Sequence, residues 1–202
     1  MKDLRHNVLV LGADYALYMV GLTFASQSTI LPAFAAWLGA PNVVIGAIPA
    51  VMTLGWFLPS LFAAGHTETL TRKLPFIMKW TVWERVPFAV MAVVAFVVAE
   101  RAPSLALALL LAMLLLTTGV GGFLMPAWMD LIGQALPTTI RGRFFALSNF
   151  GAGLAGFGAG FLIAEVLARV PAPASYGLCF VGATVCTGVS YVAPSPSYGS
   201  RR

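Results

Sequence analysis

The sequence predicts an all-α membrane protein with six transmembrane helices, and three observations lead to this fold class. Of the 202 residues, 59% are hydrophobic and only 9% are charged, whereas a soluble domain carries about 25% charged residues. The apolar residues form six segments that are long enough to cross a bilayer, which takes about 20 residues for a helix. The basic residues gather in those connections between segments that would lie on one side of the membrane, as expected for a multi-pass protein of the cell membrane.

The six expected helices follow one another along the chain as a single bundle, residues 1–193. The breaks between them carry Gly, Pro, Asn or charged residues, which are typical of helix ends. The first apolar run continues to about Leu38, too long for the core of a signal peptide, so we expect a retained first span. We expect helices over residues 8–37, 43–64, 76–99, 104–128, 142–167 and 175–193, followed by a short polar tail at 194–202.

The basic residues predict the orientation of the bundle. If both termini are cytoplasmic, nine basic residues lie on the cytoplasmic side and only Arg101 and Arg169 lie on the other. Such an excess of Lys and Arg marks the cytoplasmic side. The nine are Lys2, Arg5, Arg72, Lys73, Lys79, Arg141, Arg143, Arg201 and Arg202.

Several function classes are not expected. The net charge of +5 comes without a basic stripe interleaved with aromatic residues, so we expect no nucleic-acid partner. Cys179 and Cys186 share one apolar segment without a CxxC pattern, and His6 lies far from His66, so neither a metal site nor another cofactor is predicted. No GxSxG or HExxH pattern and no histidine within a span is present, so we expect no enzyme.

Two similar segments suggest an internal repeat of three helices. LPAFAAWLGAP closes the first helix and MPAWMDLIGQALP closes the fourth, with Pro32 and Gly39 each 94 positions before Pro126 and Gly133. A repeat of three crossings must be inverted in the membrane, and inverted three-helix repeats are a known plan of secondary transporters. Chance similarity between apolar helices is the alternative.

Small residues recur along the fifth expected helix. Ala152, Gly156, Gly160 and Ala164 are each four positions apart. Membrane helices gain from close backbone approach, so this stripe predicts a packing seam. A sliding seam between gating helices is the alternative interpretation.

The chain resembles the N-terminal six-helix half of a major facilitator superfamily transporter. The resemblance is carried by LPAFAAWLGAPNVVIGAIPA, by the basic end of the 2–3 connection at Arg72 and Lys73, and by PAW…LPTTIRGRFFALSNFGAG. It implies alternating-access transport of a small-molecule solute, with a proton as an optional coupling ion and no covalent chemistry. The 2–3 connection departs from the family pattern, because Thr69 or Glu68 stands where the family usually has aspartate.

The resembled transporters have two six-helix halves, whereas this chain has one. A homodimer, or a separate C-terminal half, would complete the translocation unit. A truncated gene product is another alternative, and so is a six-helix scaffold or remnant that transports nothing.

The candidates for the substrate path are Asp14, Thr23, Gln27, Trp128 and Asn149. Polar groups inside a bilayer are costly and usually face a cavity or a partner. A carboxylate at Asp14 could bind a proton or a cationic substrate, unless it only reaches the cytoplasmic interface. Gln27 and Asn149 could bond a solute or a neighbouring helix.

The candidates for coupling or gating are Glu84, Arg85, Asp130, Arg141 and Arg143. Glu84 and Arg85 lie within the third helix and predict either a neutralising contact between helices or coupling-ion chemistry. Arg141 and Arg143 are expected in the cytoplasmic 4–5 connection, bound to lipid phosphates or to the end of a neighbouring helix. A gate-locking ion pair with Glu68 or Asp130 is the alternative.

Overall fold

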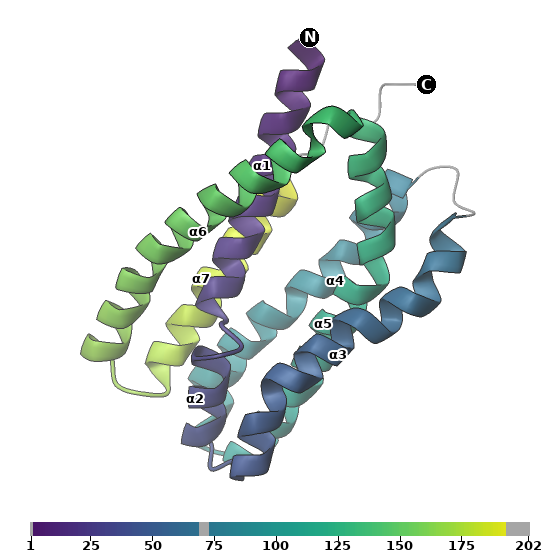
Figure 1. The fold of residues 1–202 in the computed structure, drawn as a ribbon. Coiled ribbons are helices and arrows are strands. Elements are labelled where there is room, and N and C mark those ends of the chain that lie inside the picture. Colours follow the sequence, from purple (N-terminus) through teal and green to yellow (C-terminus); the bar gives the residue numbers. More distant parts are fainter. Residues whose placement is uncertain (1, 69–72, 193–202) are drawn as a thin grey trace.

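The computed structural model describes residues 2–68 and 73–192, and every regular element in these two ranges is a helix (Figure 1). Five helices contain segments long and apolar enough to cross a membrane, while the apolar part of α1, Val8–Phe24, is shorter. The expected all-α class is confirmed, and the five candidate spans are consistent with a multi-pass membrane protein. The elements are α1 (Lys2–Phe24), α2 (Ile30–Trp37), α3 (Asn42–Glu68), α4 (Lys73–Val93), the π-helical segment η1 (Val94–Val98), α5 (Pro103–Ala135), α6 (Thr138–Arg169) and α7 (Ala174–Val192).

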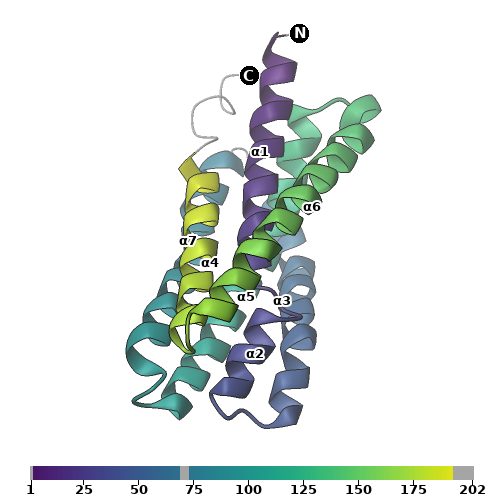
Figure 2. The same cartoon turned by 90° about the vertical axis from the view of Figure 1, so that its left-hand side faces the viewer.

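The helices run up and down along one bundle. In Figure 1, α1 begins and α7 ends at the same end, whereas the connections from α2 to α3 and from η1 to α5 lie at the opposite end. Helices α1 and α2 follow each other in the same direction (Figures 1 and 2). Together, α1 and α2 extend about as far along the bundle as one of its long helices.

The expected single helix over residues 8–37 is wrong, because the chain leaves the helix after Phe24 and resumes at Ile30. Pro32 favours a break at this point, although the prolines within α3, α4 and α5 are accommodated in continuous helices. The Pro32 ring would clash with the carbonyl group of Ser28 if the helix continued through this point. The backbone N–H of Leu31 bonds instead to the carbonyl oxygen of Ser26 at 3.0 Å, and the N–H of Ser28 bonds to the Ser26 hydroxyl at 3.3 Å.

Helix α5 is longer than predicted, which shortens the connection to α6. It continues through Pro126 to Ala135, so that only Leu136 and Pro137 separate it from α6. Leu136 is extended, with φ −122° and ψ 131°, as expected for a residue that precedes proline. Arg141 therefore lies within the first turns of α6 and not in a loop, which corrects the sequence-based placement.

Each of the longest helices packs on a defined set of neighbours. Helix α5 contacts α3 and α4, helix α1 contacts α6 and α7, and helices α4 and α7 contact each other.

Two glycines allow α3 and α5 to cross closely. A Cβ atom on Gly122 would lie 2.3 Å from the carbonyl oxygen of Trp56, and one on Gly55 would lie 2.1 Å from Oγ1 of Thr118. Lipid tails are as apolar as the helices, so close backbone approach contributes van der Waals contact that hydrophobicity does not supply. The tightest glycine-mediated approach in the described residues is therefore on α5 and α3.

The predicted stripe on α6 meets α1 along only part of its length. Ala152 is buried, and a Cβ on Gly156 would lie 3.1 Å from Oγ1 of Thr23 in α1. A Cβ on Gly160 would meet nothing within 4 Å, and Ala164 is exposed. Residues four apart turn about 40° further around a helix at each step. The buried face consequently continues through Ala159 and Ile163 instead, which corrects the expectation for Gly160 and Ala164.

Two apolar cores lie at different heights of the bundle. The larger surrounds Phe34 of α2, whose ring centroid is 5.5 Å from that of Phe180 in α7. The smaller joins Leu11 of α1 to Ile132 and Phe144. The part of α1 between these cores carries the half-buried polar side chains of Asp14, Tyr15 and Tyr18.

Candidate functional site

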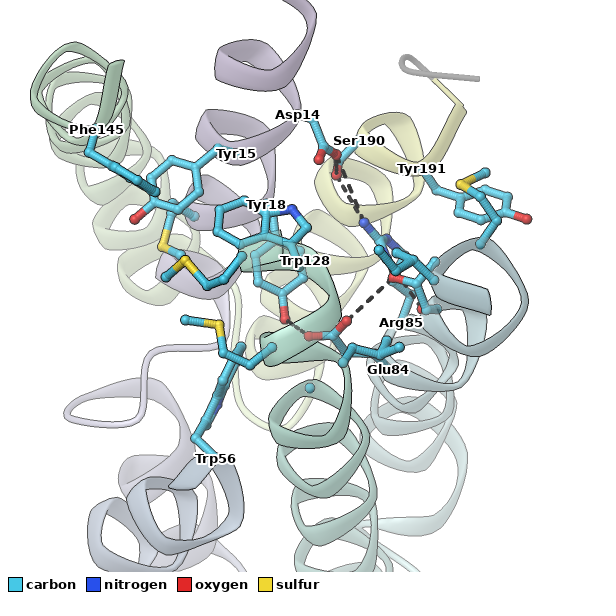
Figure 3. A pocket seen from close by; sticks show the side chains of 18 residues that line it. Asp14, Tyr15, Tyr18, Trp56, Glu84, Arg85, Trp128, Phe145, Ser190 and Tyr191 are labelled. Atoms are coloured by element: carbon cyan, nitrogen blue, oxygen red, sulfur yellow. Dashed lines mark hydrogen bonds and ion pairs between the residues drawn. The ribbon is translucent and has the colours of Figure 1, made fainter. Parts of the chain in front are cut away.

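A cavity of about 300 Å³ opens between helices α1, α4, α5 and α7, with single side chains added by α3 and α6 (Figure 3). Along α1 its residues lie between Leu11 of the smaller core and Phe24 of the larger one. The cavity is lined by Asp14, Tyr15, Tyr18, Met19, Trp56, Ile77, Met78, Thr81, Glu84, Arg85, Gly121, Leu124, Met125, Trp128, Met129, Phe145, Ser190 and Tyr191.

Arg85 of α4 is held at the wall of the cavity by bonds on each side of its guanidinium group. Its Nε donates to the carbonyl oxygen of Thr187 at 2.8 Å, and Nη2 donates to Oγ of Ser190 at 3.1 Å, both on α7. Its Nη1 donates to the hydroxyl of Thr81, one turn earlier on α4. The planar guanidinium presents several donors in a fixed geometry, so these bonds fix its position.

Aromatic rings flank the same guanidinium group. Its Cζ lies 5.5 Å from the ring centroid of Tyr18 and 5.7 Å from that of Tyr191. These distances are within the range of cation–π interactions. Arg85 thus joins α4 to α1 through one ring and to α7 through the other.

Asp14 of α1 faces Arg85 through a serine. Its Oδ1 accepts a hydrogen bond of 2.5 Å from the hydroxyl of Ser190, which itself accepts from Arg85. The direct distance from Nη2 of Arg85 to Oδ1 of Asp14 is 4.0 Å. The carboxylate and the guanidinium group therefore form an ion pair that is bridged by a neutral hydroxyl.

Glu84 of α4 is the most deeply buried charged side chain of the cavity, with 7% of its surface exposed. Its Oε1 accepts from the hydroxyl of Tyr18, and its Oε2 accepts from Oγ1 of Thr81 at 3.4 Å. Gly121 of α5 leaves the room for this carboxylate, since a Cβ there would lie 2.8 Å from Oε1. Both donors to Glu84 are neutral, so its charge is oriented but not cancelled by them.

The opposite wall of the cavity is aromatic. The rings of Tyr15 and Trp128 stack with centroids 5.9 Å apart, and Phe145 meets Trp128 edge-on at 6.4 Å. Figure 3 shows Tyr15 and Phe145 on one side of the cavity and Arg85 on the other. The arrangement combines a polar wall with a flat apolar wall.

Four of the sequence-predicted residues meet at this cavity. Asp14, Glu84, Arg85 and Trp128 all line it, although they come from three different helices. Glu84 and Arg85 share the hydroxyl of Thr81, and their other bonds reach Tyr18 of α1 and Ser190 of α7. Asn149 lies next to the cavity, where its Oδ1 accepts from the hydroxyl of Tyr15 at 3.0 Å.

The remaining substrate-path candidates lie elsewhere. Thr23 bonds to the carbonyl oxygen of Met19 at 3.1 Å and faces Gly156 at the crossing of α1 and α6. Gln27 is exposed in the break between α1 and α2. Neither side chain lines the cavity, so the structure does not join them to the Asp14 cluster.

Arg141 holds the end of a neighbouring helix. Its Nε donates to the carbonyl oxygen of Leu136 at 3.0 Å, and Nη2 donates to that of Gly133. A cation that binds the last carbonyl groups of a helix is favourable there, because they have no partner within the helix. This is the bond to the end of a neighbouring helix that the sequence analysis gave as one interpretation of Arg141.

The other gating candidates do not join the cavity. Arg143 and Asp130 are both exposed and line no part of it. The side chain of Glu68 and the connection that contains Thr69 and Arg72 lie outside the described residues. The alternative of a gate-locking pair with Glu68 or Asp130 therefore stays a prediction.

Several residues of the site are missed by the sequence analysis. Ser190, Tyr18 and Thr81 supply its hydroxyl bridges, and Trp56 and Tyr15 supply aromatic walls. A weak signal exists on two helices, where Asp14 and Tyr18, and Thr81 and Arg85, are each four positions apart and so share a helix face. Ser190 has no such signal, because a lone serine in an apolar helix usually bonds its own backbone.

The arrangement can bind and orient a molecule. Within the described ranges, 2–68 and 73–192, no group of three or more His, Cys, Asp or Glu side chains could hold a metal ion. The fold and the site define the class as a helical multi-pass membrane protein with a buried charged cluster facing a cavity. Comparison with protein-family models, with curated protein sequences and with solved structures gave no match.

Proposed function

We propose that the chain is a secondary-transporter subunit of the cell membrane that carries a small-molecule solute through the cavity by alternating access. The observation that carries the proposal is the cluster of Asp14, Glu84 and Arg85 at the wall of a cavity within a membrane bundle. Charged groups are expensive inside a bilayer and usually mark a substrate or ion pathway.

The packing of the helices supports an inverted repeat of the kind that secondary transporters use. Helix α5 packs between α3 and α4 in the way that α1 packs between α6 and α7, and α4 meets α7. This is the pattern expected when three crossings are related to the next three by a pseudo-two-fold axis in the membrane plane. On this proposal α1 and α2 together form the first of six crossings, with both termini on the cytoplasmic side.

The proposed resemblance to one half of a major facilitator superfamily transporter calls for a second six-helix unit. Within the apolar windows of α3 and α6 only 11% of the residues are buried, against 39–44% in those of α4, α5 and α7. Helices α3 and α6 therefore have the most surface left for lipid or for another bundle. We take the second unit to be a second copy of this chain, and size measurement in detergent checks the dimer.

Accessibility of the cavity from the two sides of a membrane tests the proposal without knowledge of the solute. The variant Met125→Cys places a thiol in the cavity, in a background in which Cys179 and Cys186 are replaced by alanine. Reconstituted in vesicles with uniform orientation, it should react with a membrane-impermeant maleimide added on either side, because alternating access opens the cavity to each side in turn.

A matched control is Leu110→Cys in the same helix, which lies in the larger core and should react from neither side. Reaction of Met125→Cys from one side only, in a sample shown to be dimeric, would contradict alternating access. That outcome would favour a scaffold that binds but does not transport.

A further inference from the structure

The charges around the cavity do not balance. Among the residues that line it, two carboxylates, Asp14 and Glu84, face a single guanidinium group, Arg85. The remaining contacts of these groups are to neutral hydroxyls and to the carbonyl oxygens of Thr81 and Thr187. With both carboxylates ionised, one negative charge remains among side chains that are at most 16% exposed.

The hydrogen bonds favour the charged form of both acids. Ser190 donates to Asp14, while Tyr18 and Thr81 donate to Glu84. A carboxylate that accepts hydrogen bonds is stabilised relative to its protonated form. Burial opposes an uncompensated carboxylate, so a ligand that carries one positive charge would stabilise the ionised form of the two acids and be held by it.

The shape and chemistry of the other wall restrict the kind of cation. The stacked rings of Tyr15 and Trp128 and the ring of Trp56 offer flat apolar faces, whereas those of Tyr18 and Tyr191 are already occupied by Arg85. Four methionines, Met19, Met78, Met125 and Met129, complete the lining, and methionine adapts to irregular apolar shapes. An inorganic cation would need several oxygen ligands instead.

We propose that the cavity binds a monovalent organic cation with an aromatic body, such as an aryl-substituted quaternary or protonated amine. This inference rests on the transport function proposed above. The ammonium group would lie toward Asp14 and Glu84, and the aromatic body would lie against Tyr15, Trp128 and Trp56. A volume of about 300 Å³ is at the lower end of the range for small-molecule sites, which limits the ligand to one or two rings.

A pair of probes that differ only in charge tests this inference. Benzyltrimethylammonium and neopentylbenzene have the same shape, with a quaternary nitrogen in the first and a carbon in the second. Binding of radiolabelled benzyltrimethylammonium to the purified full chain in detergent should saturate, and neopentylbenzene should compete at least about tenfold more weakly, because it lacks the attraction to the carboxylates and the rings.

Two charge-removing variants locate the effect. Glu84→Gln and Asp14→Asn keep the size of the side chain and each remove the excess charge, so each should weaken cation binding by about tenfold or more while binding of neopentylbenzene changes little. The matched control is Glu165→Gln, which removes a carboxylate from the exposed end of α6, where it pairs with Arg169. That variant should bind both probes like the original chain.

The outcomes separate the inference from the function on which it rests. If neopentylbenzene binds as well as the cation, or if both carboxylate variants keep full cation affinity, the inference is overturned, while a cavity that reacts from both membrane sides still supports transport. No saturable binding of either probe also overturns it. Should Glu84→Gln fail to fold, Asp14→Asn decides, because Asp14 is partly exposed and its side chain has fewer contacts.

Discussion

Arg85 is the residue on which the buried cluster depends. Among the described residues it is the one cation that lines the cavity, and it binds α7 through Ser190 and Thr187 while it faces Asp14 on α1. A buried ion pair adds little net stability compared with an apolar replacement of both partners, but the loss of one partner leaves an uncompensated charge in a low-dielectric interior. Arg85 is thus expected to matter more for stability than an exposed arginine of the same chain.

The variant Arg85→Met tests this expectation with a side chain of similar length. It should lower the free energy of unfolding by about 3–5 kcal/mol, because two carboxylates then lack their cation. The matched variant Arg169→Met breaks the exposed pair with Glu165 and should change the free energy of unfolding by no more than about 1 kcal/mol.

Unfolding in mixed micelles of mild and denaturing detergent gives both values. Adding Glu84→Gln to Arg85→Met should restore part of the lost stability, since one of the two uncompensated charges is removed. Equal losses in Arg85→Met and Arg169→Met would contradict a stabilising role of the cluster.

At the scale of the helices, hydropathy and turn residues predict where most elements lie but not where they bend. Helix α7 differs from its prediction by one residue at each end, and α5 differs by one residue at its start. Pro173, Pro194 and Pro103 mark these three ends in the sequence. The break after Phe24 is missed because Ser26 and Gln27 interrupt the apolar run too briefly to lower its hydropathy. Pro126 suggests an end to α5, yet the helix continues, because membrane helices tolerate proline where neighbours satisfy the freed backbone groups.

Two glycines differ in the space beside them, so replacement by alanine should change the stability of the protein in opposite directions. Gly122→Ala places a Cβ 2.3 Å from the carbonyl oxygen of Trp56 and should cost about 1–3 kcal/mol through overpacking. Gly142→Ala meets no atom within 4 Å and should stabilise α6 by up to about 1 kcal/mol, because alanine favours the helix.

Thermal unfolding in detergent, followed by circular dichroism, compares the two variants under one condition. A midpoint for Gly122→Ala at or above that of the original chain would contradict the crossing of α3 and α5 at this residue.

For the molecule as a whole, the sequence predicts a multi-pass helical bundle and some residues of its site. It does not predict how the helices bring these residues together. Asp14, Glu84 and Arg85 stand out because charge within an apolar span is costly. Ser190 and Tyr18 do not stand out, because neutral hydroxyls are common in membrane helices. Helices that are apolar on all sides carry no strong periodic signal for the face that meets a neighbour, so the meeting of α1, α4 and α7 at Arg85 requires three-dimensional information.

The orientation of the whole bundle is testable by labelling. Thiols introduced as Asn42→Cys and Glu100→Cys lie in exposed positions at the end of the bundle opposite the α5–α6 connection (Figure 1). Both should react with a membrane-impermeant reagent added to intact cells, because the arginine-rich connections are expected on the cytoplasmic side. Thr139→Cys, exposed beside Arg141, should react only after the cells are opened.

The chain without introduced cysteines is the control for Cys179 and Cys186. Equal labelling of Glu100→Cys and Thr139→Cys in intact cells would rule out this topology.

The interruption between α1 and α2 has a consequence for the surroundings of the bundle. Gln27, Ser28 and Thr29 are exposed at a level flanked by continuous helices on either side (Figures 1 and 2). Hydrocarbon chains offer peptide groups no hydrogen bonds, so non-helical backbone at this depth needs water or another polypeptide beside it. We therefore expect water or another polypeptide, and not acyl chains, beside this flank of the protein.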